Sequence, residues 1–479
     1  MTRSDKNQPL LMPSTARTTH MHVIGQPGTG KSRFLESCTM QDILSGQGVG
    51  VIDVHGPLFN DILCRLALLT EKQPDLAERI VIIDPTDPNY TVTFNPLEAI
   101  PGFSIERLVA FMTDVVVKIW NIDLAEAPRM VRLLSFTFLA LALLGLTLVD
   151  LPRFLSDSSW RESLLARINH PDVLAYFHSE FPKFEDLIQQ WVTPVLNRVG
   201  PFVFDPDLRL IFSSGSTISF QDILDQGLIL LVNLSKGLLG EANSALLGAF
   251  IVALLQKAAL VRDETRRRPF YLYVDEFQSY STDNIKDILS ELRKYRLVLT
   301  IAHQYLGQLS PDLLGAVLNT PGTIACFRVG YQDARVLAPE IFPYGYLEHS
   351  EWRLQLARVG HLLAPLPYEV RSPVINEELA SLLTQLPDRE FVCKRRGPYP
   401  PIKLRTLDMP DPVVTIELEQ RVRGLRHLSG SRYGRRKREI QRESANEQVR
   451  LLLPAAQDGQ YETSPKTSVD TSEIPMWGD

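Results

Sequence analysis

The sequence predicts an α/β fold in which a mostly parallel sheet is interrupted by an inserted all-α domain. Short apolar runs that end in turn residues alternate with helical stretches, which is typical of a parallel sheet covered by helices on both faces. Residues 97–200 instead show helical spacing without strand-like runs, so we expect a separate domain there. The expected division is a polar leader at 1–21, a core formed by 22–96 and 201–410, the inserted domain at 97–200, and a basic and then polar, disordered tail at 411–479.

The core strands follow one another in two groups. Residues 22–24 lead through a glycine-rich turn into a helix from Lys31 to about Leu44, and strands at 49–54 and 79–84 end in turns that contain proline. The second group comprises strands at 228–233, 270–274, 297–302 and 323–329, a helix at 242–261 and a hairpin-like pair around Phe391 and Ile402. Together they would complete one sheet.

Composition narrows the class of protein. Hydrophobic residues make up 44% of the 479 residues, as in ordinary globular proteins. The four cysteines are widely separated, which indicates a reducing compartment and no zinc site. The net charge of -6 gives no general nucleic-acid signature, and residues 1–19 lack the apolar core of a signal peptide. We expect a cytoplasmic protein.

One uncharged stretch, residues 133–149, reaches the short limit of a membrane span. A single span here would place the two halves of the core on opposite sides of a membrane. We therefore interpret the stretch as a buried helix of the inserted domain.

Residues 25–32 match the phosphate-loop pattern G-x-x-x-x-G-K-[ST] at a strand-to-helix turn. Glycines let backbone N–H groups turn inward around phosphate, and the helix N-terminus adds partial positive charge. Lys31 would reach the β- and γ-phosphates of ATP, and the Ser32 hydroxyl would coordinate Mg²⁺. The expected nucleotide-binding residues are Gly25, Gln26, Pro27, Gly28, Thr29, Gly30, Lys31 and Ser32.

Two adjacent carboxylates, Asp275 and Glu276, follow the apolar run 270–274 at the strand end where open α/β sheets bind ligands. Asp275 would complete the Mg²⁺ site, and Glu276 would act as general base on the attacking water. An Asp-Glu pair is also common as a solvated strand end, so the interpretation depends on the phosphate loop. It requires Lys31 and Asp275 to face one triphosphate from adjoining strands.

Polar residues near the strand at 297–302 are further candidates. Gln304 would sense the γ-phosphate or orient the water, whereas His303 is expected to pack locally. Arg293 and, as second choice, Arg296 would reach the γ-phosphate of a neighbouring subunit in a ring, although charges at a helix end are often only a solvated face.

Three other features are left with two interpretations each. Asp53 and Asp84 would either support the Mg²⁺ shell or merely end their strands. The basic stretch 421–442 would either bind DNA or an acidic partner with salt dependence, or be a solubilising tail.

The ordered motifs resemble the HerA/FtsK superfamily of DNA-pumping ATPases, and most closely the type IV secretion coupling proteins related to VirD4, TraG and TraD. The resemblance covers roughly residues 22–406. The motifs that carry it are GQPGTGKS at Gly25, VIDVHG at Val51, IIDPTDPN at Ile82, ILLVNLSKG at Ile229, YVDEFQSY at Tyr273, ELRKYRL at Glu291 and IAHQYLGQL at Ile301.

This resemblance implies a RecA-like P-loop core with an all-α insertion, ATP and Mg²⁺ as cofactors, and a homo-hexameric ring around DNA that is driven by ATP hydrolysis. It also implies a relaxase or type IV secretion components as partners. The same residues receive the same roles as above. Residues 1–22 leave no room for the transmembrane helices of membrane-bound coupling proteins, so we expect no intrinsic anchor. Either partners recruit the protein to the inner face of the cell membrane, or it serves a different DNA-moving process.

Other functions remain open at this level. A HerA-like pump in DNA end processing would use the same motor, and a nucleotide-dependent assembly switch of a secretion complex would bind ATP without sustained turnover. A small-molecule kinase fits the large insertion less well. The residues do not distinguish single-stranded from double-stranded DNA.

Overall fold

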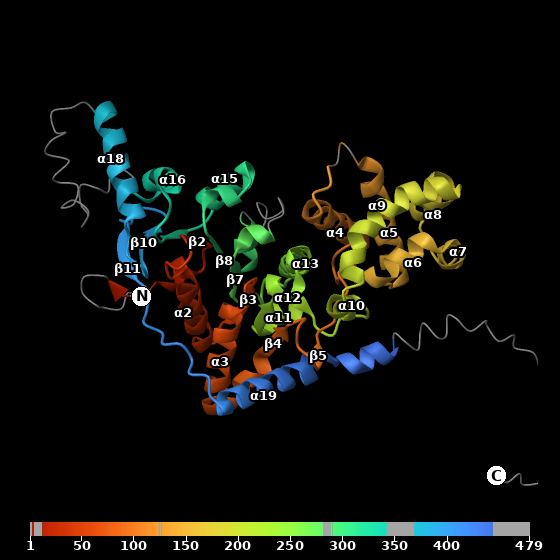
Figure 1. The fold of residues 1–479 in the computed structure, drawn as a ribbon, viewed down its shortest axis with the longest axis horizontal. Helices are drawn as coiled ribbons and strands as arrows, with labels where there is room; N and C mark the ends of the chain where they lie inside the picture. Colours follow the sequence, from red (N-terminus) through yellow and green to blue (C-terminus); the bar gives the residue numbers. More distant parts are fainter. Residues whose placement is uncertain are drawn as a thin grey trace, which may run out of the picture.

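The computed structural model describes residues 2–3, 12–123, 125, 127–280, 289, 291–342 and 368–443. Within these ranges one sheet organises the chain (Figure 1). Its strands are β1 (Thr2–Arg3), β2 (Met21–Ile24), β3 (Gly48–Asp53), β4 (Ile80–Ile83), β6 (Ile229–Asn233), β7 (Phe270–Val274), β8 (Leu297–His303), β9 (Thr323–Cys326), β10 (Glu390–Arg395) and β11 (Ile402–Arg405).

The strand order is β1-β11-β10-β9-β2-β8-β7-β3-β6-β4. Every neighbouring pair from β9 to β4 is parallel, whereas β10, β11 and β1 add an antiparallel edge. The predicted α/β class with a mostly parallel sheet is therefore confirmed.

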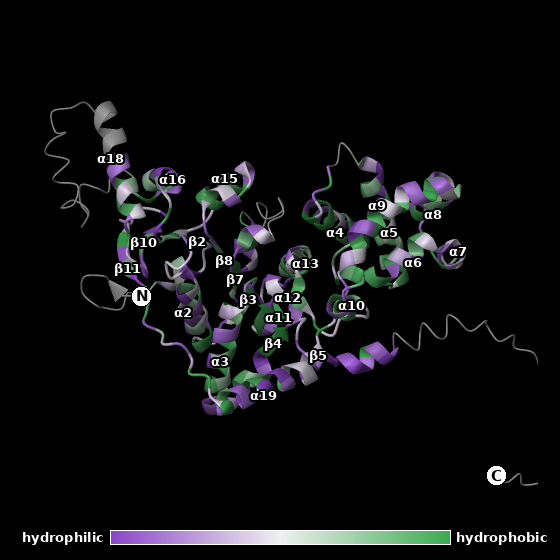
Figure 2. Ribbon diagram, viewed as in Figure 1, coloured by the Kyte–Doolittle hydropathy of each residue, from purple (hydrophilic) through white to green (hydrophobic). Residues whose placement is uncertain are grey.

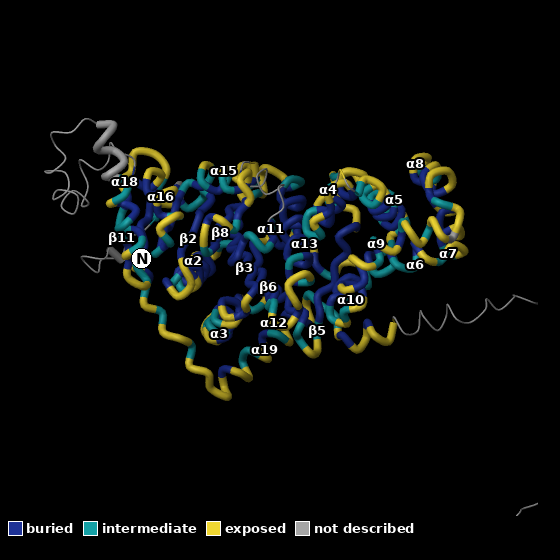
Figure 3. Tube along the Cα trace, turned by 45° about the horizontal axis from the view of Figure 1, so that its top comes forward, coloured by how far each residue is buried: buried dark blue, intermediate teal, exposed yellow. Residues whose placement is uncertain are grey.

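Helices cover both faces of the sheet, and the strands between them are buried (Figure 3). The core helices are α1 (Ser14–Arg17), α2 (Lys31–Leu44), α3 (Pro57–Lys72), α11 (Phe220–Gln226), α12 (Lys236–Leu239), α13 (Glu241–Leu260), α15 (Pro311–Asn319), α16 (Tyr331–Ile341), α18 (Tyr368–Thr384) and α19 (Ile416–Tyr433). Side chains of β7 alternate between the faces: Leu272 packs in the cluster that contains α13, and Tyr273 packs in the cluster that contains α2 and α3.

Helix α13 has the length and apolar composition to cross a membrane, alone among the described helices. In the protein 83% of its apolar window is buried, as for a core helix. Of the stretch 133–149, interpreted above as a buried helix, residues 133–144 lie in a shorter helix that ends at Leu144 and buries Leu134 and Phe138, whereas Leu148 and Val149 belong to a separate 3-10 turn.

The inserted unit is helical throughout its described residues and lies to one side of the sheet in Figure 1. Its helices are α4 (Ile105–Ile119), α5 (Pro128–Leu144), α6 (Leu151–Ser156), α7 (Ser158–Leu165), α8 (Pro171–Ala175), α9 (Glu185–Val203) and α10 (Pro206–Phe212). The expected boundary at residue 200 falls inside α9, because Gly200 and Pro201 do not end this helix.

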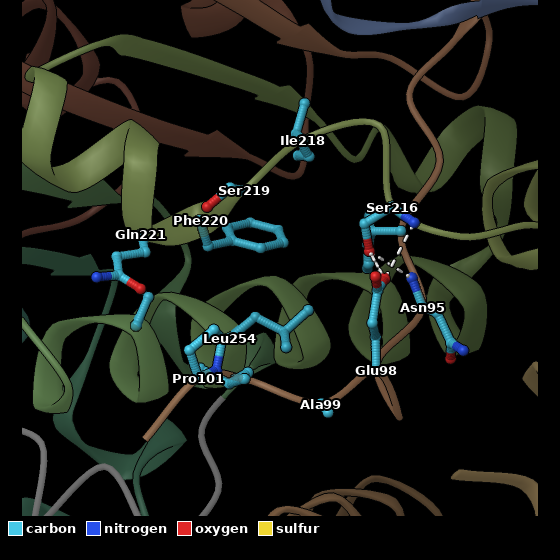
Figure 4. Close-up of a pocket in the computed structure, with 13 residues that line it drawn as sticks. Asn95, Glu98, Ala99, Pro101, Ser216, Ile218, Ser219, Phe220, Gln221 and Leu254 are labelled. Carbon is cyan, nitrogen blue, oxygen red and sulfur yellow. Dashed lines mark hydrogen bonds between the residues drawn. The ribbon is translucent and has the colours of Figure 1, made fainter. Parts of the chain in front are cut away.

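Two chain segments connect the insertion to the core, and they lie side by side. The Thr93 N–H donates to the Thr217 hydroxyl (3.1 Å), and the Thr217 N–H donates to the Thr93 carbonyl (2.8 Å). Beside them the Glu98 carboxylate accepts hydrogen bonds from the N–H and the hydroxyl of Ser216, at the rim of a cavity of about 310 Å³ (Figure 4). These contacts hold together the two segments through which the inserted unit is connected to the core.

Part of the expected disordered tail is ordered. Helix α19 is mostly hydrophilic in Figure 2, yet Leu418 and Leu425 are buried against the face formed by α2 and α3. After it, β12 (Arg435–Arg436) pairs with β5 (Tyr90–Thr91). Ion pairs to the core, described below, supply much of the attachment of α19 to the core. Its sequence therefore shows little apolar periodicity. The rest of the tail, residues 444–479, lies outside the described residues.

Candidate active site

The loop of residues 25–32 connects β2 to α2 and depends on its glycines. Gly28 and Gly30 have φ values of +76° and +104°, which favour glycine. A Cβ on Gly25 would lie 2.5 Å from the Cβ of Phe327. The loop is further held by a hydrogen bond of 2.8 Å from the Arg389 N–H to the Thr29 carbonyl.

Lys31 begins α2 and is only 8% exposed. Its ammonium group donates to the backbone carbonyls of Gly25 and Gln26. Burial lowers the pKa of Lys31, and the carboxylates of Asp275 and Glu276 partly oppose this effect. The lysine and the tandem acids therefore lie within electrostatic range of one another.

The strands that carry these groups do not adjoin, which corrects the prediction. Strand β8 lies between β2 and β7, with Ile24 paired to His303 and Val274 paired to Ile301. The position of β8 between β2 and β7 could not be predicted from the sequence, because strand order across a sheet does not follow chain order. All three strands are parallel, so their carboxyl ends still meet at one edge.

Glu276 lies at this edge in a left-handed backbone conformation, with φ of +48°. Its carboxylate accepts a hydrogen bond of 2.6 Å from the Gln304 side-chain amide and another from Gln278, and the His55 Nε2 lies 3.9 Å away. Burial alone would raise the pKa of Glu276, but the nearby His55 and the hydrogen bonds from Gln304 and Gln278 lower it to about 2. Glu276 is therefore ionised at neutral pH.

His55 was not singled out by the sequence. His55 follows β3 by two residues. The only feature of the sequence that could have indicated it is this position after a strand end, on the same edge of the sheet as the phosphate loop. Its contact with Glu276, as the main cause, raises the pKa of His55. His55 thus lies next to the acidic group, which favours its protonated form.

Asp275 is buried, and its carboxylate accepts the N–H of Glu276 (3.1 Å). Burial, and then the charges of Asp53 and Glu276, raise the pKa of Asp275 to about 6. This excess of negative charge fits a divalent cation. No group of three or more His, Cys, Asp or Glu side chains within the described ranges is arranged to hold a metal by itself, so a Mg²⁺ ion would need the Ser32 hydroxyl and phosphate oxygens as well.

The two other acidic strand ends have structural partners. The Asp53 carboxylate accepts the N–H groups of His55 (2.8 Å) and Phe59 (2.9 Å) and so caps α3. The Asp84 carboxylate accepts from Asn233 (3.1 Å) and forms an ion pair of 2.6 Å with Arg426 of α19. Both residues end their strands, and Asp53 adds charge near Asp275.

His303 packs locally, as expected. Its Nε2 lies 2.7 Å from Nε2 of His22, and its Nδ1 lies 3.1 Å from the Tyr305 carbonyl. Burial, as the main cause, lowers the pKa of His303 to about 4. The ring is therefore neutral at pH 7.

Arg293 and Arg296 are exposed and precede β8, whereas Gln304 follows it. Seven extended residues span about 23 Å at 3.3 Å per residue. Neither arginine lies at the edge that carries the phosphate loop of its own chain.

This combination of a parallel sheet, a phosphate loop, tandem acids and a terminal glutamine at one edge, with an all-α insertion, defines the RecA-like P-loop fold. Comparison with solved structures agrees. The chain is similar to the plasmid coupling protein TrwB in complex with the non-hydrolysable GTP analogue GDPNP, with a TM-score of 0.56 and 16% identity over 84% of this chain and 88% of that one.

Two further structures extend this likeness. TrwB in complex with ADP and Mg²⁺ has a TM-score of 0.53 and 15% identity over 84% of this chain and 89% of that one. VirB4 of Thermoanaerobacter pseudethanolicus has a TM-score of 0.51 and 12% identity over 85% and 96%. No family model matches the sequence, and no curated protein sequence matches it. The chain therefore shares the fold of conjugative coupling proteins and of VirB4, as the motif resemblance predicted.

Proposed function

We propose that this protein is an ATP-hydrolysing DNA translocase that acts in conjugative or type IV secretion-like transfer. The observation that carries the proposal is the contact of Gln304 with Glu276 at the same sheet edge as Lys31. A nucleotide-binding loop, an ionised carboxylate and a polar sensor then face one site. The TrwB structures with nucleotides support the same use of this fold.

In this proposal the backbone of residues 25–32 and the Lys31 ammonium hold the triphosphate of ATP. Ser32 and Asp275 would hold Mg²⁺, which supplies charge neutralisation at the phosphates when bound. A cation there also lowers the cost of ionising Asp275 beside Glu276.

Glu276 orients and polarises the attacking water. A carboxylate whose pKa is about 2 is a weak base, so loss of one of its hydrogen bonds would increase its basicity. Gln304 is placed to provide this change, because an amide that turns towards a γ-phosphate leaves the carboxylate. Hydrolysis would then depend on the presence of the third phosphate.

Assembly completes the site. Arg293, or as second choice Arg296, would supply positive charge to the γ-phosphate of a neighbouring chain, since both precede β8, which spans about 23 Å before it reaches the site edge of its own chain. A homo-hexameric ring meets this need, because head-to-tail contacts place different surfaces of two subunits together. The ring would surround DNA, work with a relaxase or secretion components, and lie in the cytoplasm, recruited to the inner face of the membrane.

The test is ATP turnover with and without single-stranded and double-stranded DNA, for the wild type and for Glu276→Gln. DNA should stimulate the wild type, and the variant should bind ATP with hydrolysis reduced by about 10²-fold or more. Turnover that no DNA raises would favour the assembly switch instead. Glu241→Gln, whose side chain is 84% exposed, is the matched control.

A further inference from the structure

A second polar pocket lies at the sheet edge opposite the phosphate loop. Its volume is about 510 Å³, and its lining includes Thr19, His20, Arg293, Gly322, Arg395 and Arg396. His20 directly precedes β2, and Arg395 ends β10 opposite Thr323 at the start of β9. The pocket is thus formed by four separate parts of the chain.

The walls of this pocket are fixed by close backbone contacts. The Gly322 N–H donates to the His20 carbonyl (2.9 Å), and the Arg396 N–H donates to the Gly322 carbonyl (2.8 Å). A Cβ on Gly322 would lie 2.2 Å from the Thr19 hydroxyl oxygen, so only glycine allows this approach. The polar side chains are therefore held on a rigid frame.

The pocket is strongly basic. Its lining contains three guanidinium groups, those of Arg293, Arg395 and Arg396, and no described lining residue is acidic. None of the three forms an ion pair with a carboxylate in the part of the chain that the structure describes. The Arg395 guanidinium lies 4.0 Å from the ring centre of Tyr399, which holds it in place.

His20 lies buried in the wall of the pocket. It is 2% exposed, and its Nδ1 accepts the Leu299 N–H (2.9 Å), so the proton of the neutral ring is on Nε2. Burial, and then Arg293, lower the pKa of His20 to about 4, although the Leu289 carbonyl opposes this. Because Nδ1 is occupied by the Leu299 N–H, the Leu289 carbonyl faces the proton on Nε2. His20 therefore ties two backbone segments together at the wall of the pocket.

We infer that this pocket binds a phosphate group of the DNA backbone, an inference that rests on the proposed function. Arginine forks suit phosphate oxygens, and the pocket supplies those of Arg395 and Arg396 beside Arg293, although Arg396 also donates to the Asn319 carbonyl. Tyr399 is 44% exposed next to these cations, as in sites that track nucleic acid with charge and an aromatic surface. The ATP of the same chain is bound at the opposite edge.

The pocket is also joined to the nucleotide site by two strands. β2 begins directly after His20 and ends at the phosphate loop, and β8 contains Leu299 and ends directly before Gln304. His20 itself bonds β2 to β8 through Leu299. Phosphate bound in the pocket would therefore contact the start of the two strands that lead to Lys31 and to Gln304.

The experiment compares the wild type with a full-length double variant that carries both Arg395→Ala and Arg396→Ala. Fluorescence anisotropy with a fluorescein-labelled oligothymidylate, and with a duplex of the same length, is measured over a series of salt concentrations. We expect binding about 10-fold weaker, and a salt slope shallower by about 1.4 on the single strand for two lost phosphate contacts. Binding of a fluorescent ATP analogue should be retained, which shows that the variant is folded.

Two matched variants sharpen the result. Arg395→Lys with Arg396→Lys keeps both charges and should restore the salt slope. Arg107→Ala with Arg167→Ala removes the same charge from exposed positions in the inserted unit and should leave DNA binding unchanged. Arg423→Ala with Arg436→Ala, in α19 and β12, tests the C-terminal segment separately.

The outcomes separate this inference from the proposed function. If the wild type binds no DNA, the translocase proposal fails. If the wild type binds DNA and the Arg395 and Arg396 variant binds it equally well, only the pocket inference is overturned. If the Arg395 and Arg396 variant retains DNA affinity but loses ATP turnover, the pocket instead binds the nucleotide of a neighbouring chain. If only the Arg423 and Arg436 variant loses DNA binding, the C-terminal segment is the DNA-binding site.

Discussion

The side-chain amide of Gln304 donates a hydrogen bond of 2.6 Å to the carboxylate of Glu276. This bond joins the ends of β8 and β7, two strands whose order along the sheet is independent of the local sequence. It places the sensor and the acid in one unit, so a change at either residue is transmitted to the other.

Gln304→Ala should therefore reduce ATP hydrolysis by about 10- to 100-fold while ATP binding changes little, because loss of the amide that would contact the γ-phosphate and orient the water outweighs the gain in basicity of Glu276. Steady-state turnover and binding of a fluorescent ATP analogue measure the two effects. Gln385→Ala, an exposed glutamine distant in the chain, is the control. An equal loss of ATP binding and turnover would mean that Gln304 only supports the fold of the site.

Asp275→Asn should stabilise the nucleotide-free protein at pH 8, by about 1 to 3 kcal/mol. The folded pKa of Asp275, about 6, lies above its unfolded value, so ionisation opposes folding. This destabilisation is fully present above pH 6 and disappears as the pH falls towards 4. Thermal unfolding without nucleotide or Mg²⁺ should show a gain at pH 8 and little gain near pH 4.

Asp53→Asn provides the contrast to this prediction. The Asp53 carboxylate accepts the Phe59 N–H in the first turn of α3 and the His55 N–H just before the helix, so its loss should destabilise the protein by about 1 kcal/mol. Equal destabilisation by both variants would contradict the assignment of Asp275 as an electrostatically strained group.

Arg293→Ala and Glu276→Gln should each abolish turnover, yet a mixture of the two chains should recover part of it. In a mixed ring, a chain with intact Glu276 can receive Arg293 from its Glu276→Gln neighbour. ATP turnover of the mixture against mixing ratio is the measurement. A parallel series uses Arg296→Ala in place of Arg293→Ala. If turnover does not recover in either series, neither arginine acts on the site of a neighbouring chain.

Arg426→Ala should lower the free energy of unfolding by about 2 kcal/mol, between the values for surface and fully buried ion pairs. The reason is that Asp84, which is buried, would lose its cation from α19. Arg423→Ala, whose side chain is 76% exposed, should change stability by less than about 0.5 kcal/mol. Urea denaturation of both variants decides whether α19 is an integral part of the core.

The sequence alone determined the features that depend on local spacing. Residues 25–32 could be recognised as a phosphate loop because glycine, lysine and serine at fixed offsets are needed around phosphate, and Asp275 and Glu276 because they end an apolar run. The alternation of strands and helices determined the α/β class, since side-chain periodicity within one element does not depend on the rest of the chain.

Only the tertiary structure decided which distant elements meet. It placed β8 between β2 and β7, brought His55 to Glu276, and put Arg293 at the edge opposite its own phosphate loop. It also ordered α19 through Arg426 and Asp84, which are 342 residues apart. Strand crossings and ion pairs between remote residues are set by the packing of the whole sheet, and no local pattern encodes them.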